Sequence, residues 1–264
     1  MPLVSETNLS LAGKVAIITG GSRGIGAAAV RLFASAGAKV LFNYRQAKTQ
    51  ADSLVEELGP GKCAAVPCDL RGTGNAKNLI DAAVERFGRL DIMVANHGVW
   101  PAKDIPVDQL PDEQWRNTVS VNLDSVFALV KHAVTQMKIQ PKTGSASGHI
   151  VLVSSTAGQR GEAFHCDYAA TKGALISMVK GLSTELARDK IYVNCVAPGW
   201  VDTDMSSATL NDERARAKVL GTIPLGRVAT PQEIAAPILF LCTPQAGFIT
   251  GEVLNVNGGA VLAG

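Results

Sequence analysis

The chain has 264 residues, of which 47% are hydrophobic and 18% charged, and its 25 basic and 23 acidic side chains leave a formal net charge of +2. Because ordinary soluble domains carry about 25% charged residues, this chain has fewer charges than its surface is expected to need. This composition excludes intrinsic disorder and a small disulfide-stapled fold, and the near-neutral charge excludes an extended nucleic-acid-binding surface.

Short runs rich in Val and Ile alternate with segments of helix length along the chain. The runs are apolar at consecutive positions, which is typical of parallel strands buried on both faces. The predicted strands are Val15–Thr19, Lys39–Asn43, Ala64–Pro67, Ile92–Ala95, Ile150–Ser154, Tyr192–Val196 and Val253–Val256. The predicted helices lie at about 24–36, 48–58, 75–87, 117–138, 167–188 and 231–242.

This alternation predicts an α/β fold. Right-handed crossovers turn such a succession into an open, doubly wound parallel sheet of the Rossmann type, here of about seven strands, with helices on both faces. No composition shift, linker or repeat divides the chain, so we expect one domain over residues 1–264. A long polar excursion at about 203–227, with a helical pattern at 211–220, is typical of a lid over a substrate site.

A glycine-rich turn follows the first predicted strand. Residues Thr19 to Gly26 read T-G-G-S-R-G-I-G and lead into an alanine-rich helix. Glycines at such a turn let the backbone approach a pyrophosphate, and the helix N-terminus presents unpaired N–H groups. This context predicts a dinucleotide site, although the spacing is G-x-x-x-G-x-G rather than the common G-x-G-x-x-G. A tight turn without a ligand is the alternative.

The end of the second strand indicates which dinucleotide is bound. NAD sites place an acidic residue about 20 positions beyond the glycines, whereas NADP sites supply positive charge for the 2′-phosphate. Here the chain reads Asn43-Tyr44-Arg45, and Arg23 lies in the glycine turn. Because a guanidinium can bind phosphate through two hydrogen bonds, we predict a preference for NADP(H) over NAD(H). The alternative is that both arginines are solvated surface charges.

A serine, a tyrosine and a lysine suggest acid–base chemistry. Ser155 follows the fifth strand, and Tyr168 and Lys172 lie four residues apart, on one face of the next helix. A tyrosine, with a pKa near 10, is a poor base at pH 7, but a nearby ammonium typically lowers an acid's pKa by about 1 to 3 units. We therefore expect Lys172 to lower the pKa of Tyr168, so that the tyrosine acts as a general acid or base.

Together these motifs resemble the short-chain dehydrogenase/reductase family, from about Lys14 to Gly259. The glycine turn and the Y-x-x-x-K pair match the family's patterns, and so does the segment from Pro198-Gly199 to Thr203. The family's serine falls on Ser155, its helical asparagine on Asn122, and the acidic residue that it aims at adenine on Asp69. The chain is most similar to the branch of 3-oxoacyl-carrier-protein reductases and glucose-dehydrogenase-like enzymes.

The resemblance implies hydride transfer between nicotinamide and a carbonyl or secondary alcohol. Ser155 would hold the substrate oxygen, Tyr168 would protonate it, and Lys172 would also hold the nicotinamide ribose. Asn122 would position a water that relays protons. The implied cofactor-binding residues are Gly20, Ser22, Arg23, Gly24, Ile25, Gly26, Asn43, Tyr44, Arg45, Asp69, Leu70, Asn96, Gly98, Tyr168, Lys172, Pro198, Gly199, Val201 and Thr203.

One motif departs from the family's pattern. The family usually has Asn-Asn-Ala-Gly after the fourth strand, whereas this chain has Ala95-Asn96-His97-Gly98. Gly98 keeps the backbone close to the cofactor, but Ala95 removes a hydrogen-bonding side chain expected to steady the strand. A catalytic part for His97 is the minor alternative, because Tyr168 already fills the acid–base role. The remaining histidines lack metal-ligand spacing, so we predict no metal.

The substrate is the least determined part of the prediction. The expected pocket is formed by the lid and by Val99, Trp100, Gln159, Arg160, His165 and Trp200. A 3-oxoacyl thioester, free or on a carrier protein, is the leading substrate. A sugar, steroid, polyphenol or small secondary alcohol is the alternative. An inactive cofactor-binding regulatory protein is the remote alternative, since Asn122, Ser155, Tyr168 and Lys172 are all present.

The sequence also predicts how the protein assembles and where it works. By resemblance, helices 117–138 and 167–188 and the C-terminal strand join subunits into a homotetramer. No uninterrupted apolar run exceeds five residues, whereas a membrane helix needs about 18 to 20. The first 14 residues do not resemble a secretion signal, and the five cysteines include no C-x-x-C pair. We therefore expect a cytoplasmic protein without membrane contact.

Overall fold

The computed structural model describes residues 9–142 and 144–262. Most of the first 14 residues, which by sequence do not resemble a secretion signal, therefore lie outside the described residues. Seven parallel strands form one sheet in the order β3-β2-β1-β4-β5-β6-β7, which confirms the predicted doubly wound fold. The strands are β1 (Val15–Ile18), β2 (Lys39–Tyr44), β3 (Cys63–Pro67), β4 (Ile92–Ala95), β5 (Gly148–Val153), β6 (Ile191–Pro198) and β7 (Val253–Val256).

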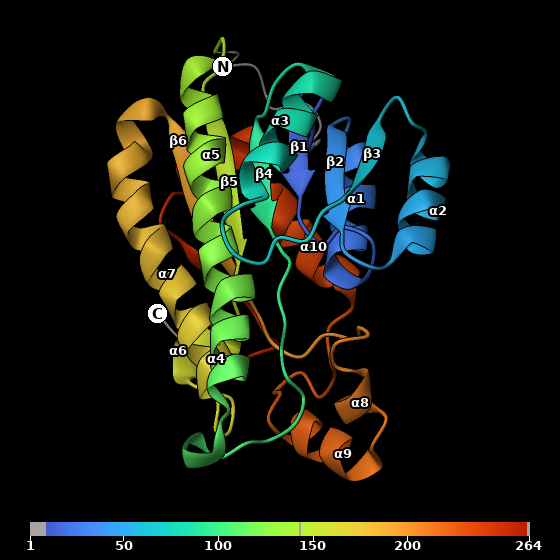
Figure 1. Ribbon diagram of the computed structural model, residues 1–264, viewed down its shortest axis with the longest axis vertical. Helices are drawn as coiled ribbons and strands as arrows, with labels where there is room; N and C mark the ends of the chain where they lie inside the picture. Colours follow the sequence, from blue (N-terminus) through green and yellow to red (C-terminus); the bar gives the residue numbers. More distant parts are fainter. Residues whose placement is uncertain (1–8, 143, 263–264) are drawn as a thin grey trace.

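Helices cover both faces of the sheet (Figure 1). One face packs against α1 (Gly24–Ser35), α2 (Lys48–Leu58) and α10 (Pro231–Phe240). The other face packs against α3 (Ala76–Phe87), α5 (Ser125–Ile139) and α7 (Cys166–Leu186). Both cores consist largely of Val, Ile, Leu and Ala side chains below 9% exposure, which explains why the strands are apolar at consecutive positions.

Shorter elements connect these layers. They include α6 (Thr156–Arg160), α8 (Ser207–Leu210), α9 (Glu213–Gly221) and the 3₁₀ turns Val107–Gln109, Ala187–Asp189 and Pro244–Ala246. In Figure 1, α8 and α9 lie below the sheet, beyond the carboxyl ends of the strands. The order of the strands reverses between β1 and β4, and such a switch point opens a crevice at the carboxyl edge of a parallel sheet.

The helix predicted at 117–138 begins earlier and is interrupted. α4 (Asp112–Val119) follows Pro111 and carries Asp112 and Glu113 in its first turn, where acidic residues stabilise a helix. A π-helical turn, Ser120–Asp124, then joins α4 to α5. The prediction of one uninterrupted helix was therefore wrong, because hydrophobic periodicity does not reveal a single inserted residue.

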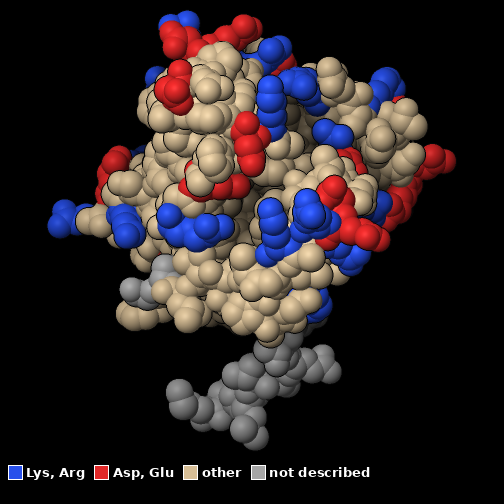
Figure 2. Space-filling view, turned by 90° about the horizontal axis from the view of Figure 1, so that it is seen from below, with Lys and Arg blue, Asp and Glu red and all other residues tan. Residues whose placement is uncertain are grey.

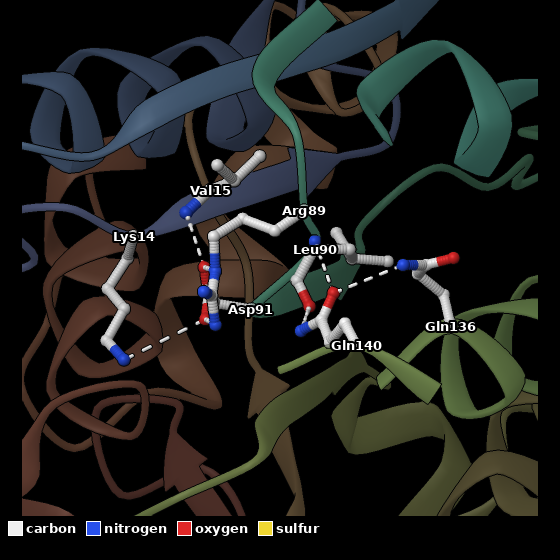
Figure 3. Close-up of polar contacts among 7 residues, drawn as sticks. All are labelled: Lys14, Val15, Arg89, Leu90, Asp91, Gln136 and Gln140. Carbon is white, nitrogen blue, oxygen red and sulfur yellow. Dashed lines mark hydrogen bonds and ion pairs between the residues drawn. The ribbon is translucent and has the colours of Figure 1, made fainter. Parts of the chain in front are cut away.

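A polar network fixes the amino edge of the sheet, opposite the crevice (Figure 3). The Asp91 carboxylate, just before β4, accepts hydrogen bonds from the Val15 N–H at 3.0 Å and from the Arg89 guanidinium at 2.7 and 2.8 Å. The Gln140 side chain, just after α5, bonds both main-chain groups of Leu90. These contacts tie β1, β4 and α5 together where the strands begin.

The surface reflects the low charge of the chain. Figure 2 shows Lys, Arg, Asp and Glu side chains scattered over one face, among a larger area of other residues. Within the described residues, the exposed large hydrophobic side chains include Trp115 and Phe127. No helix in that part of the chain combines the length and apolar character needed to cross a membrane.

Candidate active site

A cleft of about 760 Å³ opens at the carboxyl ends of the strands. All the cofactor-binding residues inferred from the sequence line it, except Gly26. Of the four catalytic candidates, Ser155, Tyr168 and Lys172 line the cleft and Asn122 does not. Residues that are far apart in the sequence therefore meet at one edge of the sheet.

The glycine turn is shaped for close approach of the backbone. Gly20 and Gly24 have positive φ angles of 63° and 53°, in the region that favours glycine. A Cβ at Gly26 would collide with the carbonyl oxygen of Gly20, so α1 begins directly against the turn. Gly26 thus shapes the site from behind, without lining it.

Asn43 supports the turn through its side chain. Its Oδ1 accepts a hydrogen bond from the Gly20 N–H at 2.9 Å, and its Nδ2 donates to the Cys68 carbonyl at 2.9 Å. The residue is only 4% exposed. Its amide joins the turn after β1 to the end of β3, so the side chain contributes to the site mainly as a brace.

Arginines gather where the sequence predicts the phosphate-bearing end of the cofactor. Arg23, Arg45 and Arg71 line this part of the cleft. Arg23 forms an exposed ion pair with Asp204 at 3.2 Å, and Arg71 bonds Asp69 at 2.6 and 2.9 Å. Hydrogen bonding by Arg71, with a weaker contribution from Arg45, holds the pKa of Asp69 below its usual range. The sequence analysis missed Arg71, because no motif marks it.

Tyr168 and Lys172 face the cleft from the first turns of α7. The Lys172 Nζ donates to the Val153 carbonyl at 2.8 Å and lies 5.7 Å from the centroid of the Tyr168 ring. Burial lowers the pKa of Lys172 to about 8. Burial also raises the pKa of Tyr168 to about 12, against the lowering effect of a hydrogen bond with Ser155. The expected lowering by Lys172 is absent, because loss of solvation dominates.

Ser155 is held against the tyrosine by the contact between α6 and α7. It caps α6, and its Oγ accepts a hydrogen bond from the Ala157 N–H at 3.1 Å. Gly158 allows α6 to approach α7 closely, since a Cβ there would lie 2.6 Å from the Lys172 carbonyl carbon. The same backbone contact therefore positions both Ser155 and Lys172.

Asn122 lies behind the cleft, in the π-helical turn. Its side chain accepts from the Val99 N–H at 2.8 Å, donates to the Val99 carbonyl at 2.9 Å, and reaches Thr171 at 3.3 Å. The amide is thus occupied by protein groups, and the residue is fully buried. The side chain fixes the strand-to-loop segment after β4, and the positioning of a water by Asn122 stays a prediction.

His97 provides polar contacts at the end of β4. Its Nδ1 lies 2.7 Å from the Thr19 hydroxyl and its Nε2 lies 2.7 Å from the Ser125 hydroxyl, so both ring nitrogens have partners. Burial, assisted by the charge of Lys172, lowers the pKa of His97 to about 4 and keeps the ring neutral at pH 7. The imidazole therefore steadies the end of β4, where Ala95 provides no polar side chain.

The substrate end of the cleft is aromatic. Val99, Trp100, Arg160 and Trp200 line it as predicted, together with Glu162, which the sequence analysis missed. Gln159 and His165 were also predicted to line the pocket, and this was wrong. The Gln159 side chain bonds Asn255 at 2.5 Å, and the His165 ring stacks on Trp100. Of the predicted lid, only Thr203, Asp204, Met205 and Ser206 line the cleft. Across the described residues, no three His, Cys, Asp or Glu side chains gather as a metal site would require.

Comparison with known proteins identifies the family. A family model described as enoyl-(acyl carrier protein) reductase matches residues 20–261. The chain is also 37% identical to the 3-oxoacyl-(acyl-carrier-protein) reductase FabG of Thermotoga maritima, over 96% of this chain and 100% of that relative. The chain belongs to the short-chain dehydrogenase/reductase family. The chain is therefore an oxidoreductase of this family.

Solved short-chain dehydrogenase/reductase structures share the fold. A glucose/ribitol dehydrogenase of the family from Brucella melitensis is 36% identical, with a TM-score of 0.87, over 96% of this chain and 98% of that one. A family member from Burkholderia cenocepacia, solved in complex with NADP, is 32% identical, with a TM-score of 0.86, over 95% of this chain and 98% of that one.

Proposed function

We propose that this protein is an NADP(H)-dependent reductase of carbonyl groups, and that its substrates are 3-oxoacyl thioesters, free or attached to a carrier protein. The observation that carries the proposal is the contact between Ser155 and the half-buried Tyr168, whose ring lies 5.7 Å from the Lys172 Nζ in the cleft. The name of the Thermotoga maritima relative supports the substrate class.

The proposed roles follow from this geometry. When bound, the nicotinamide supplies a hydride to the carbonyl carbon. Ser155 holds the carbonyl oxygen, and Tyr168 gives its proton to that oxygen, which leaves an alcohol product and a tyrosinate. The nearby Lys172 ammonium stabilises the tyrosinate. Burial raises the pKa of Tyr168 to about 12, so at pH 7 the hydroxyl carries the proton that the reducing direction consumes.

Asn122 is a positioning residue in this proposal. It holds the main chain of Val99, which lines the substrate end of the cleft, and it bonds Thr171 next to Lys172. We propose that residues 1–264 act as one cofactor-binding and catalytic domain. Residues 203–227 would form its lid, with the contact to substrate made by 203–206.

The cofactor preference rests on the charges around the cleft. Arg23 and Arg45 supply positive charge near the end of β2, and no carboxylate lies between residues 40 and 49. We expect kcat/KM with NADPH to exceed that with NADH, and Arg45→Ala to reduce the ratio. Equal values for the two cofactors in the unaltered protein would contradict the preference.

The assembly is a further part of the proposal. The exposed apolar side chains on α4 and α5, and the small residues of α7, favour a homotetramer built from these helices and β7. All five cysteines are free, which is typical of a protein that works in the cytoplasm, and we propose that location.

A panel of thioesters tests the reaction. Oxidation of NADPH would be followed with an acetoacetyl thioester, a matched 2-enoyl thioester, and representative sugars, steroids and secondary alcohols. We expect the 3-oxoacyl thioester to be the best substrate. Faster turnover of the enoyl thioester would show that the protein reduces a carbon–carbon double bond rather than a carbonyl group, and would contradict the proposal. Binding of NADPH without turnover of any compound would favour a regulatory protein.

A further inference from the structure

Two tryptophans form a corner at the substrate end of the cleft. The rings of Trp100 and Trp200 are 5.8 Å apart, with an interplanar angle of 87°, and both line the cleft that contains Ser155 and Tyr168. Trp100 follows the segment that Asn122 holds, and Trp200 follows the end of β6. Asn122 therefore fixes both the segment that carries Trp100 and the helix that carries Lys172.

Trp100 is fixed on two sides. His165, only 4% exposed, stacks on it with a centroid distance of 5.1 Å and an interplanar angle of 20°. The Trp100 side chain also forms a hydrogen bond with Glu162, whose carboxylate accepts from the indole N–H. A ring that is held in this way loses little conformational freedom when a ligand binds, so its contribution to recognition is preorganised.

The chemistry of the corner favours one class of ligand. A flat aromatic ring can stack on one indole and present its edge to the other, which are the two arrangements that aromatic pairs prefer. A cationic group could lie over an indole face, but Arg160 lines the same end of the cleft and would repel it, and the Glu162 carboxylate is already engaged by Trp100. An aliphatic chain would gain contact area without a preferred orientation.

We infer that Trp100 and Trp200 form an aryl subsite, so that the preferred substrates carry an aromatic ring on the carbonyl carbon, as in 3-aryl-3-oxoacyl thioesters. This inference rests on the proposed carbonyl reduction and specifies its substrate. Glu162 and His165 are positioning residues, which act through Trp100.

The test compares two substrates of nearly equal size. One is the N-acetylcysteamine thioester of 3-oxo-3-phenylpropanoate, and the other is its 3-cyclohexyl counterpart, which lacks a π face. We expect kcat/KM for the phenyl compound to be about 10-fold higher. Trp100→Leu and Trp200→Leu should each remove most of this ratio while leaving the cyclohexyl compound within about threefold. Phe248→Leu, an exposed ring outside the cleft lining, is the control.

Glu162→Gln separates orientation of the ring from charge. A glutamine oxygen can still accept from the Trp100 N–H, so this variant should keep the phenyl preference, whereas Glu162→Ala should weaken it. A general structural role would lower both substrates alike. Thermal unfolding of each variant identifies those that fail to fold, and the two tryptophan positions provide independent tests.

Binding measured by calorimetry keeps the subsite distinct from the reaction. Titration of the protein loaded with NADP⁺, which has no hydride to transfer, should show the same phenyl preference even if neither compound is reduced in the NADPH assay, in which case the proposed function alone would fail. Equal affinities for phenyl and cyclohexyl compounds, or a phenyl preference that survives both tryptophan substitutions, would overturn the subsite.

Discussion

Tyr168 has access to the cleft and is protonated at pH 7, as an acid in the reducing direction must be. Burial raises its pKa to about 12, and Ser155 provides the hydrogen bond that orients the hydroxyl. Lys172, whose own pKa is lowered to about 8, carries the charge that a tyrosinate would need beside it. Ser155, Tyr168 and Lys172 therefore act together as one acid–base group.

Tyr168→Phe removes the proton without emptying the space that the ring fills. We expect turnover to fall by about 10² to 10⁴, the contribution typical of a positioned acid, while the affinity for NADPH stays nearly the same. Stopped-flow or steady-state assays and cofactor titration measure the two quantities. Tyr192→Phe, on β6 and outside the cleft lining, should have normal turnover; near-normal turnover of Tyr168→Phe would remove the tyrosine from its role.

His97 makes stability depend on pH. Its folded pKa is about 4, against an ordinary value near 6.5, so between these values the unfolded chain binds more protons than the folded chain. Stability from this group is therefore fully present above about pH 6.5 and is lost as the pH falls toward 4. Integration from pH 6.5 to 4.5 gives a loss on the order of 2 kcal/mol.

We expect His97→Gln to have a smaller loss of unfolding free energy over this pH range than the unaltered protein. Urea unfolding at several pH values measures it. His149, with a pKa also lowered to about 4 by burial, contributes in the same direction, so the double variant should be flatter still. His132→Gln, on α5, is the control, and identical slopes for all variants would contradict the account.

Among the elements, strands were easier to predict than helix ends and side-chain partners. The central strands β1, β2, β4, β5 and β6 are almost wholly buried, so consecutive Val and Ile residues mark them directly, whereas the edge strands β3 and β7 are only partly buried. The five-residue α6 is too short for a periodic signal. The glycine turn and the Tyr168–Lys172 pair were visible because their spacing is local. The Trp100–Glu162 bond and the His97 contacts were not, since they join segments distant in sequence.

The contact between α6 and α7 is sensitive to one methyl group. In Gly158→Ala, the added carbon would meet the main chain of Lys172 and Gly173, which cannot move aside as a flexible side chain could. We expect a destabilisation of about 1 to 3 kcal/mol and, because Ser155 is displaced, at least a 10-fold loss of kcat. Thermal unfolding and steady-state kinetics check both; Gly74→Ala, with no atom within 4 Å, should change neither.

At the scale of the whole molecule, the low charge of the chain has two structural counterparts. Helices cover the central strands on both faces of the sheet, and the side chains of Trp115 on α4 and Phe127 on α5 are 42% and 53% exposed. Exposed aromatic side chains on adjacent helices are typical of a surface that contacts another protein. The apolar composition is therefore divided between the core and a proposed subunit interface.

Phe127→Glu tests this interface. A carboxylate buried between subunits without a partner is costly, so we expect the variant to shift toward a smaller assembly while its secondary structure stays intact. Size-exclusion chromatography with light scattering, at micromolar concentration, measures the mass. A monomeric unaltered protein, or an unchanged mass for Phe127→Glu, would refute the proposed tetramer.

The π-helical turn at Ser120–Asp124 sets the rotational phase between α4 and α5. Each residue of an α-helix advances the chain by about 100° around the axis, so deletion of one residue from this turn would rotate α4 by that angle relative to α5. Thr118 would leave Asp167, which it now bonds at 2.8 Å, and Asn122 would turn away from Val99. A one-residue deletion here should therefore be far more damaging than any single substitution in the turn.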